Sequence, residues 1–261
     1  MGQVIRQLAV LTTATLRESI RNRLLLTTLA FAVVLVGLSV AAASVSIGEQ
    51  VRLIVDVGLA AASALGSAIA IAVTVSSFAG ELTHRTAYPV LVRPLSRSVF
   101  VAGKYFGLVA TMMVVASLMV LSTAAIAALY GGPVPAALWA SLVLTNIEMA
   151  VVVALTLLFS SFAAPALAAT YAAGFVLAGN LTSDIVAMAE RFGSATAEIA
   201  PLLRVSYIVL PDLARLSART QAANGLPVAF DLLGWATLYG LGYAATAVIV
   251  AAWLFERRRS V

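Results

Sequence analysis

The sequence predicts an all-α polytopic membrane protein that forms a single domain over residues 1–261. The chain is 62% hydrophobic and only 10% charged, with a mean hydropathy of +1.04, whereas soluble domains are about half apolar and about a quarter charged. The apolar residues are mostly Ala, Val and Leu. This composition favours packed helices over a β-barrel, whose strands would alternate apolar and polar side chains.

Charge and cysteine usage narrow the classes of function. The formal net charge is +5 and the sequence pI is about 10.0. Basic residues that flank membrane spans account for this balance, so no nucleic-acid partner is predicted. The chain has no cysteine and a single histidine, His84, which excludes disulfides, cysteine nucleophiles and a zinc site built from His and Cys. No metal site is predicted.

Residues 1–23 predict a helix that lies in the membrane interface and leads into the first span. Apolar residues such as Val4, Leu8 and Leu11 recur close to helical spacing, with arginines between and after them. The alternative is a solvated helix that simply precedes the span. A cleavable signal peptide would place its apolar core nearer the start, so this segment is predicted to be retained.

Six apolar runs are predicted to cross the membrane. They cover residues 24–43, 57–79, 103–130, 136–159, 164–180 and 231–255. Most of them are long enough for a bilayer core of about 30 Å, but the fifth is short by itself and could continue as a helix to residue 191. The mixed stretch 180–230 predicts a long extracytoplasmic loop of short amphipathic helices on the membrane surface, broken at its prolines.

The distribution of basic residues orients these spans. Six spans place both termini and the segment 80–104 on one side. Eleven of the 16 Lys and Arg residues fall on that side: Arg6, Arg17, Arg21, Arg23, Arg85, Arg93, Arg97, Lys104, Arg257, Arg258 and Arg259. Cytoplasmic segments are enriched in Lys and Arg, so both termini and this segment are predicted to be cytoplasmic.

The segment 80–104, GELTHRTAYPVLVRPLSRSVFVAGK, interrupts two membrane-length apolar runs. One interpretation is a solvated loop whose arginines only set the orientation. Residues 87–92 are too apolar to prefer water, however, and Arg85, Arg93 and Arg97 surround them. An apolar surface ringed by basic residues suits docking into a partner's groove, so this segment is predicted to contact a separate, energy-supplying subunit.

Three motifs in this segment carry a resemblance to a known family: ELTHRT at residues 81–86, VLVRPLSR at residues 90–97 and the pair Gly103-Lys104. Together they resemble the pattern of ABC transporter permeases of the type-two exporter class, in the branch linked to multicopper-enzyme maturation. The Arg-Asn-Arg at 21–23, the Leu-Pro-Asp at 210–212 and the Phe-Glu-Arg-Arg at 255–258 agree with it.

The resemblance implies a permease of the cell (inner) membrane that pairs with a second permease, identical or sibling, and with two copies of an ATP-binding subunit. ATP and Mg²⁺ would bind in that subunit, with no cofactor in this chain, and a periplasmic partner protein could join the complex. The loop between spans two and three would form a cytoplasmic coupling helix. Its contact residues would be Glu81, Arg85 and Thr86 at the start, Val90, Leu91, Arg93, Pro94 and Ser96 in the ATPase groove, and Arg97 and Lys104 at the phosphate layer or the ATPase rim.

The chain lacks the motifs of a nucleotide hydrolase. A phosphate-binding loop needs a glycine five residues before Gly103-Lys104 and a Ser or Thr after it, but Ser98 and Tyr105 occupy those places. The chain is therefore predicted not to be an enzyme, and ATP hydrolysis is expected in the partner. The alternative function is a membrane anchor or scaffold of a maturation or motility complex that transports nothing.

Glu148 and Asn146 are the strongly polar residues deep in the fourth predicted span. An ionisable side chain inside the bilayer costs roughly a few kcal/mol and by default indicates function, so both residues are candidates for a translocation pathway. The alternative for Glu148 is a carboxyl group bonded to a neighbouring helix. Asn146 would then be unrelated to it, because residues two apart point to different faces of a helix.

Overall fold

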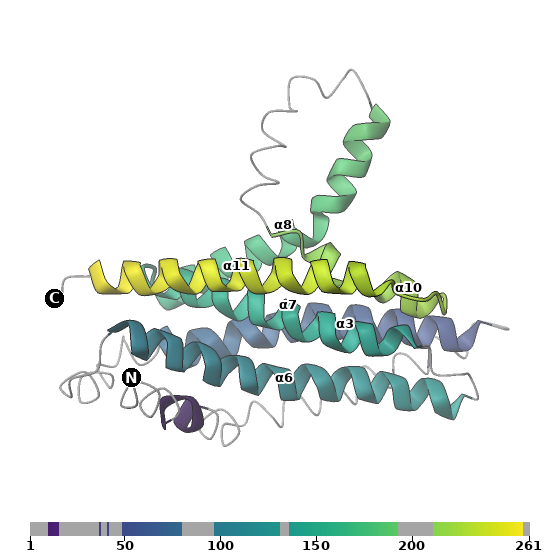
Figure 1. Ribbon diagram of the computed structural model, residues 1–261, viewed down its shortest axis with the longest axis horizontal. Helices are drawn as coiled ribbons and strands as arrows, with labels where there is room; N and C mark the ends of the chain where they lie inside the picture. The colour runs from purple at the N-terminus through teal and green to yellow at the C-terminus, as the bar shows by residue number, and fades with distance from the viewer. Residues whose placement is uncertain are drawn as a thin grey trace.

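In the computed structural model, the residues described are 10–15, 37, 41, 49–79, 97–130, 136–192 and 211–257. This part of the chain is helical apart from short connections and contains no strand. Its long helices are α3 (Gln50–Thr74), α6 (Arg97–Leu129), α7 (Ala137–Ser160), α8 (Pro165–Phe192) and α11 (Phe230–Arg257). Figure 1 shows α3, α6, α7 and α11 side by side in an elongated bundle, while the last turns of α8 lead away from it.

Four helices among the described residues are long and apolar enough to cross a membrane. They are Gln50–Phe78, Ser98–Leu129, Ala137–Ser160 and Phe230–Arg257. These helices coincide with the second, third, fourth and sixth predicted spans, so the all-α class and the presence of several apolar helices long enough to cross a membrane are confirmed. The first predicted span lies outside the described residues except at Gly37 and Ala41, which are helical. A count of six spans stays a prediction.

Several helix bounds differ from the predicted spans. Helix α3 begins at Gln50 rather than 57, and α6 begins at Arg97 rather than 103. The extra turns carry charged residues that a hydropathy boundary leaves out, although the arginines among them favour a helix about as readily as leucine does. The fifth span continues to Phe192 as α8, as its sequence allowed, and only Pro165–Leu181 is an apolar stretch.

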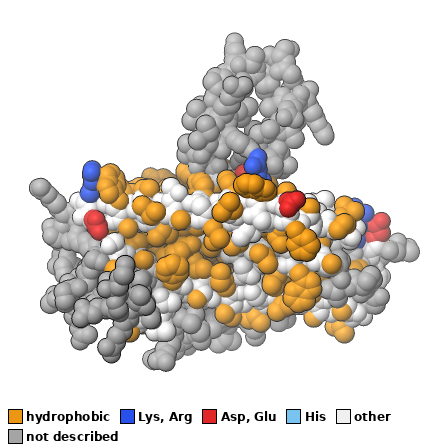
Figure 2. Space-filling view, in the orientation of Figure 1, with side chains coloured by type: hydrophobic (Ala, Val, Ile, Leu, Met, Phe, Trp, Pro, Cys, Tyr) orange, Lys and Arg blue, Asp and Glu red, His pale blue; other side chains and the backbone are white. Residues whose placement is uncertain are grey.

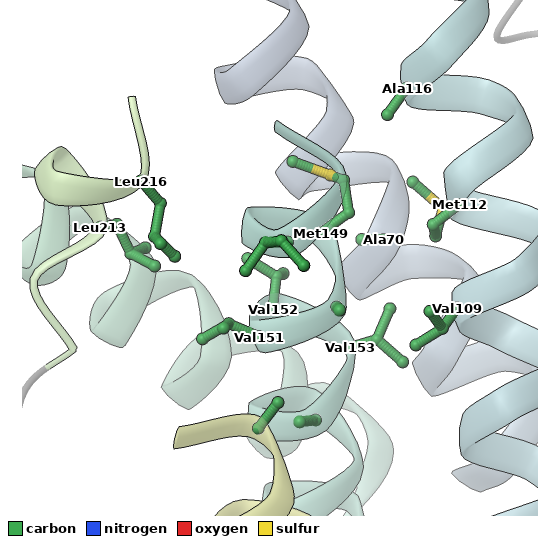
Figure 3. Close-up of a cluster of buried hydrophobic side chains, with 14 of the residues drawn as sticks. Ala70, Val109, Met112, Ala116, Met149, Val151, Val152, Val153, Leu213 and Leu216 are labelled. Atoms are coloured by element: carbon green, nitrogen blue, oxygen red, sulfur yellow. The ribbon is translucent and has the colours of Figure 1, made fainter. Parts of the chain in front are cut away.

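Helix α7 is the centre of the bundle and packs against α3, α6, α8 and α11. In its most apolar stretch of 18 residues, 78% of the residues are buried, compared with 28% in the corresponding stretch of α11. Figure 3 shows the buried cluster around it, in which Met149, Val152 and Val153 of α7 lie among side chains of neighbouring helices. Figure 2 shows hydrophobic side chains spread along the visible face of the bundle, with charged ones at both ends and along the upper edge.

Glycines let the helices approach closely. A side chain at Gly58 of α3 would collide with Thr123 of α6, and one at Gly240 of α11 would collide with Ile147 of α7. Small residues at such contacts are the usual means by which membrane helices gain van der Waals packing.

The described end of the long loop packs onto the bundle. It contains the 3-10 helix η3 (Leu213–Leu216) and the short helix α10 (Arg219–Ala223). Leu213 and Leu216 are fully buried, and α10 contacts α3 and α7. The described part of the predicted loop thus contains two short helices that lie against the bundle, and the extracytoplasmic position of the loop stays a prediction.

Candidate functional site

The predicted coupling segment is attached to the bundle through an aromatic cluster. Phe78 lies in the π-helical turn η1 (Val75–Ala79) that ends α3, Phe100 lies in the first turn of α6, and Phe255 lies near the end of α11. Their ring centroids are 5.9–6.1 Å apart in all three pairs. Phe78, just before the segment 80–104, and Phe100, within it, therefore meet the end of α11 at one end of the bundle.

Lys104 lies beside this cluster and inside the bundle. Its side chain is 4% exposed, and its Nζ donates a hydrogen bond of 3.3 Å to Ser77 Oγ in η1. A buried ammonium group is costly unless it is hydrogen-bonded, so this contact fastens α6 to the end of α3. Lys104 was predicted to meet the ATPase, whereas the described structure places it in a contact between two helices of its own chain.

The other predicted coupling residues are only partly described. Arg97 is the first residue of α6. The remainder lie outside the described residues: Glu81, Arg85, Thr86, Val90, Leu91, Arg93, Pro94 and Ser96. Their contacts with a partner stay predictions.

The N-terminal segment reaches the same end of the bundle. Residues 10–15 are helical, and Thr12 Oγ1 donates a hydrogen bond of 3.4 Å to the carbonyl oxygen of Gly103. Leu11 packs on Gly103, and the buried Thr15 packs on Gly107. This part of the predicted interfacial helix therefore lies against the first turns of α6; the rest of it lies outside the described residues.

Glu148 is buried at the midpoint of α7, with only 1% of its surface exposed. Ser63 of α3 donates a hydrogen bond of 2.6 Å from its hydroxyl to Glu148 Oε1. The short distance fits a strong hydrogen bond to a carboxyl oxygen. This geometry is the one expected for a carboxyl group held by a neighbouring helix, and it places Glu148 between α3 and α7.

Asn146 points to a different neighbour. Its Nδ2 donates to Ser117 Oγ of α6 at 3.2 Å and to the carbonyl oxygen of Leu142 at 2.8 Å. The structure therefore does not bring Asn146 and Glu148 together, as their spacing of two residues predicted. One faces α6 and the other faces α3.

An ion pair that the sequence did not predict joins two segments at the opposite end of the bundle. Arg219 of α10 donates from Nε and Nη2 to the two carboxylate oxygens of Asp56 of α3, at 2.6 and 2.7 Å. Such paired hydrogen bonds fix orientation as well as distance. The hydrogen bond to Asp56 raises the pKa of Arg219 above its ordinary value, so the guanidinium stays charged. Each side chain alone looks like an ordinary loop charge, which is why the sequence carried no signal for the pair.

Residues 57–259 match the family described as Protein of unknown function (DUF2705). The chain belongs to this family. No curated protein matches the chain. The matched region begins just after Asp56 in α3 and includes the coupling segment, Glu148 and the loop that carries Arg219.

A second polar contact of this DUF2705 protein lies where the loop returns to the bundle. Asp212 is 5% exposed; its Oδ2 accepts a hydrogen bond of 2.8 Å from Arg215 Nε, and its backbone N–H donates to the Tyr239 hydroxyl of α11 at 2.9 Å. Burial raises the pKa of Asp212 above its ordinary value. The Leu-Pro-Asp motif of the sequence thus ends in a residue that joins η3 to α11.

The described part of this DUF2705 protein therefore presents three polar layers along the bundle. Lys104 and Ser77 lie at the end that carries the coupling segment, Ser63 and Glu148 lie in the middle, and Asp56 and Arg219 lie at the opposite end. Within the described ranges no three His, Cys, Asp or Glu residues are grouped so as to hold a metal ion. These contacts join helices to one another.

Proposed function

We propose that this DUF2705 protein is the membrane-spanning permease subunit of an ABC exporter of the type-two class. A separate ATP-binding subunit would dock on residues 80–104 and supply the energy. The motifs at 81–86, 90–97 and 103–104 support the proposal through their resemblance to that class, and the four apolar helices support it through their length and composition.

The observation that carries the proposal is the attachment of the coupling segment to three helices at once. The cluster of Phe78, Phe100 and Phe255 joins the ends of α3, α6 and α11, and Lys104 adds a buried polar contact to η1. A push on the segment would reach all three helices, because packed interiors move as units and deform little. In this scheme Lys104 transmits the movement, while Glu81, Arg85, Thr86 and the residues from Val90 to Arg97 contact the partner.

The proposed complex contains two permeases, identical or sibling, and two ATP-binding subunits, in the cell membrane. ATP and Mg²⁺ bind in the partner, and this chain takes no cofactor and catalyses no reaction. The basic residues at the coupling end support a cytoplasmic position for that end and for both termini. The end with Asp56 and Arg219 then faces the opposite side, where a periplasmic protein could bind.

The first test is co-purification. We expect the tagged wild-type chain, extracted from its native membrane in mild detergent, to retain an ATP-binding subunit that mass spectrometry identifies. The double variant Arg85→Glu with Arg93→Glu should lose that subunit and keep the elution volume of the folded chain. Arg52→Glu with Arg204→Glu makes the same charge change away from the coupling segment and should retain the subunit.

Retention of the ATP-binding subunit by the Arg85→Glu, Arg93→Glu variant would contradict the coupling role. An ATPase-dead partner separates export from scaffolding. If the chain is a permease, export stops when the partner cannot hydrolyse ATP. If the chain is a scaffold, its complex still assembles with that inactive partner.

Glu148 receives its own test within this proposal. Its bond to Ser63 must open if the carboxyl group takes part in translocation. We expect Glu148→Gln to change export while leaving assembly with the ATP-binding subunit intact, since an amide has nearly the same size and still accepts the Ser63 hydrogen bond. Wild-type export in this variant would leave Glu148 a purely structural role.

A further inference from the structure

The tryptophans of this chain share an unusual placement. The sequence has three of them, Trp139, Trp235 and Trp253, and they are 65%, 72% and 49% exposed. Soluble proteins bury most of the surface of this large ring. At the two surfaces of a membrane, in contrast, tryptophan is enriched because its ring is apolar and its N–H group can still reach water.

Two of these tryptophans lie on α11 at a separation that matches a bilayer. At about 1.5 Å per residue, Trp235 and Trp253 are about 27 Å apart along the helix, close to the hydrocarbon thickness of about 30 Å. No Asp, Glu, Lys, Arg or His lies between them. Asp231 precedes the first, and Glu256 and Arg257 follow the second.

Arg257 stacks on the ring of Trp253. Its guanidinium carbon lies 3.7 Å from the centroid of the Trp253 ring, which is the distance of a cation–π contact. A guanidinium stacked on an exposed tryptophan at the end of an apolar helix places a positive charge where lipid phosphates lie.

Trp139 is an exposed tryptophan on a second helix. Ile147 of α7 packs on Gly240 of α11, and each of these residues lies in the first half of its helix. Trp139 and Trp235, which lie near the starts of the two helices, are therefore at the same end of the bundle. Two independent helices thus place an exposed tryptophan at that end.

The face of α11 between its tryptophans is apolar and uncovered. Its exposed large side chains are Leu238, Leu241, Ile249 and Val250, and its most apolar stretch is only 28% buried. A contact with a second protein would need a closely packed patch, but it would not need tryptophans at two levels separated by the thickness of a bilayer.

We infer that α11 forms the lipid-facing edge of the bundle, with Trp235 and Trp253 anchored in opposite surfaces of a phospholipid bilayer. Trp139 lies in the same surface as Trp235. This assignment goes beyond the proposed function, because it holds whether or not an ATP-binding subunit is present. It also places Glu148 inside the hydrocarbon, about 13 Å from the level of Trp139 along α7.

Fluorescence quenching by lipids tests the assignment on the whole chain. Three variants each keep one native tryptophan and have the other two replaced by Phe. Each is reconstituted in phosphatidylcholine vesicles that carry bromine either near the headgroup or near the end of the acyl chain. A matched control has all three tryptophans replaced by Phe and the substitution Ala245→Trp, an exposed position close to the middle of the interval.

We expect all three native tryptophans to be quenched more by the shallow bromine than by the deep one, and the Ala245→Trp control to show the reverse order. Stronger quenching of Trp235 or Trp253 by the deep bromine would overturn the placement of the bilayer. Absence of lipid quenching at both residues, with normal quenching of the Ala245→Trp control, would overturn it as well and would indicate that a second copy of the chain covers the ends of α11. None of these measurements involves ATP or transport, so their failure is distinct from failure of the proposed function.

Discussion

The two ends of the bundle are held together by different kinds of contact. At the end that carries the coupling segment, Phe78, Phe100 and Lys104 are all less than 5% exposed. At the opposite end, the side chains of Arg219 and Asp56 are 44% and 34% exposed. The first end is joined by buried rings and a buried ammonium group, and the second by an ion pair that water reaches.

This difference predicts unequal strength. Buried aromatic side chains contribute several kcal/mol because their removal leaves a cavity, whereas exposed ion pairs contribute roughly 0–1 kcal/mol. The coupling end should therefore behave as a firm attachment, and the opposite end as one that opens readily.

The largest effect is expected from Phe100→Ala. Truncating this 1% exposed ring should lower the free energy of unfolding by about 3–5 kcal/mol, measured by denaturant titration in detergent micelles. Phe106→Ala is the matched control, since Phe106 lies on the same helix and is 55% exposed; it should cost far less. Equal losses in the two variants would show that the aromatic cluster does not hold the coupling end.

A smaller effect is expected from Ser77→Ala. It removes a hydrogen-bond acceptor from the buried Lys104 ammonium and should lower the free energy of unfolding by about 1–3 kcal/mol. Ser76→Ala changes the adjacent hydroxyl, which is exposed and bonds to the Val73 carbonyl of its own helix, so its melting temperature should stay near that of wild type. If Ser76→Ala proved the more damaging variant, the Lys104 contact would not be what joins α6 to η1.

The sequence predicted the apolar helices of the bundle better than the contacts between them. Apolar runs and basic flanks depend on residues that are close together in the chain, so four of the predicted runs coincide with helices that are long and apolar enough to cross a membrane. Hydropathy could not find the helical turns before Val57, because charged side chains there lower the average without ending the helix. It also gave no sign that Lys104 turns inward.

The contacts that the sequence missed are those between distant segments. Arg219 and Asp56 are 163 residues apart, and each is an unremarkable charge in its own surroundings. Their pairing follows from the packing of Leu213 and Leu216 on the bundle, which carries α10 to the start of α3. The local rule that residues two apart face different ways was enough, in contrast, to separate Asn146 from Glu148.

Substitutions at the opposite end should lower the stability of the fold less. A double-mutant cycle of Asp56→Ala and Arg219→Ala should give a coupling energy of about 0.2–1 kcal/mol, and added salt should reduce it because the pair is partly exposed. Unfolding of the four proteins at low and high salt measures this. A coupling energy that salt leaves unchanged would mean that the pair is shielded from water and that the two ends are not so different.

The smallest effect concerns Asp212, which connects the loop to α11. Burial raises the pKa of Asp212 above 3.8, so the folded chain binds this proton more tightly than the unfolded chain does. The resulting stabilisation is fully present below the ordinary pKa and is lost as pH rises through the folded pKa. Asp212→Asn does not titrate, so the melting temperature of wild type relative to this variant should fall as pH rises from about 4. A rise of that difference with pH would show that the bond from Arg215 outweighs burial and lowers the pKa instead.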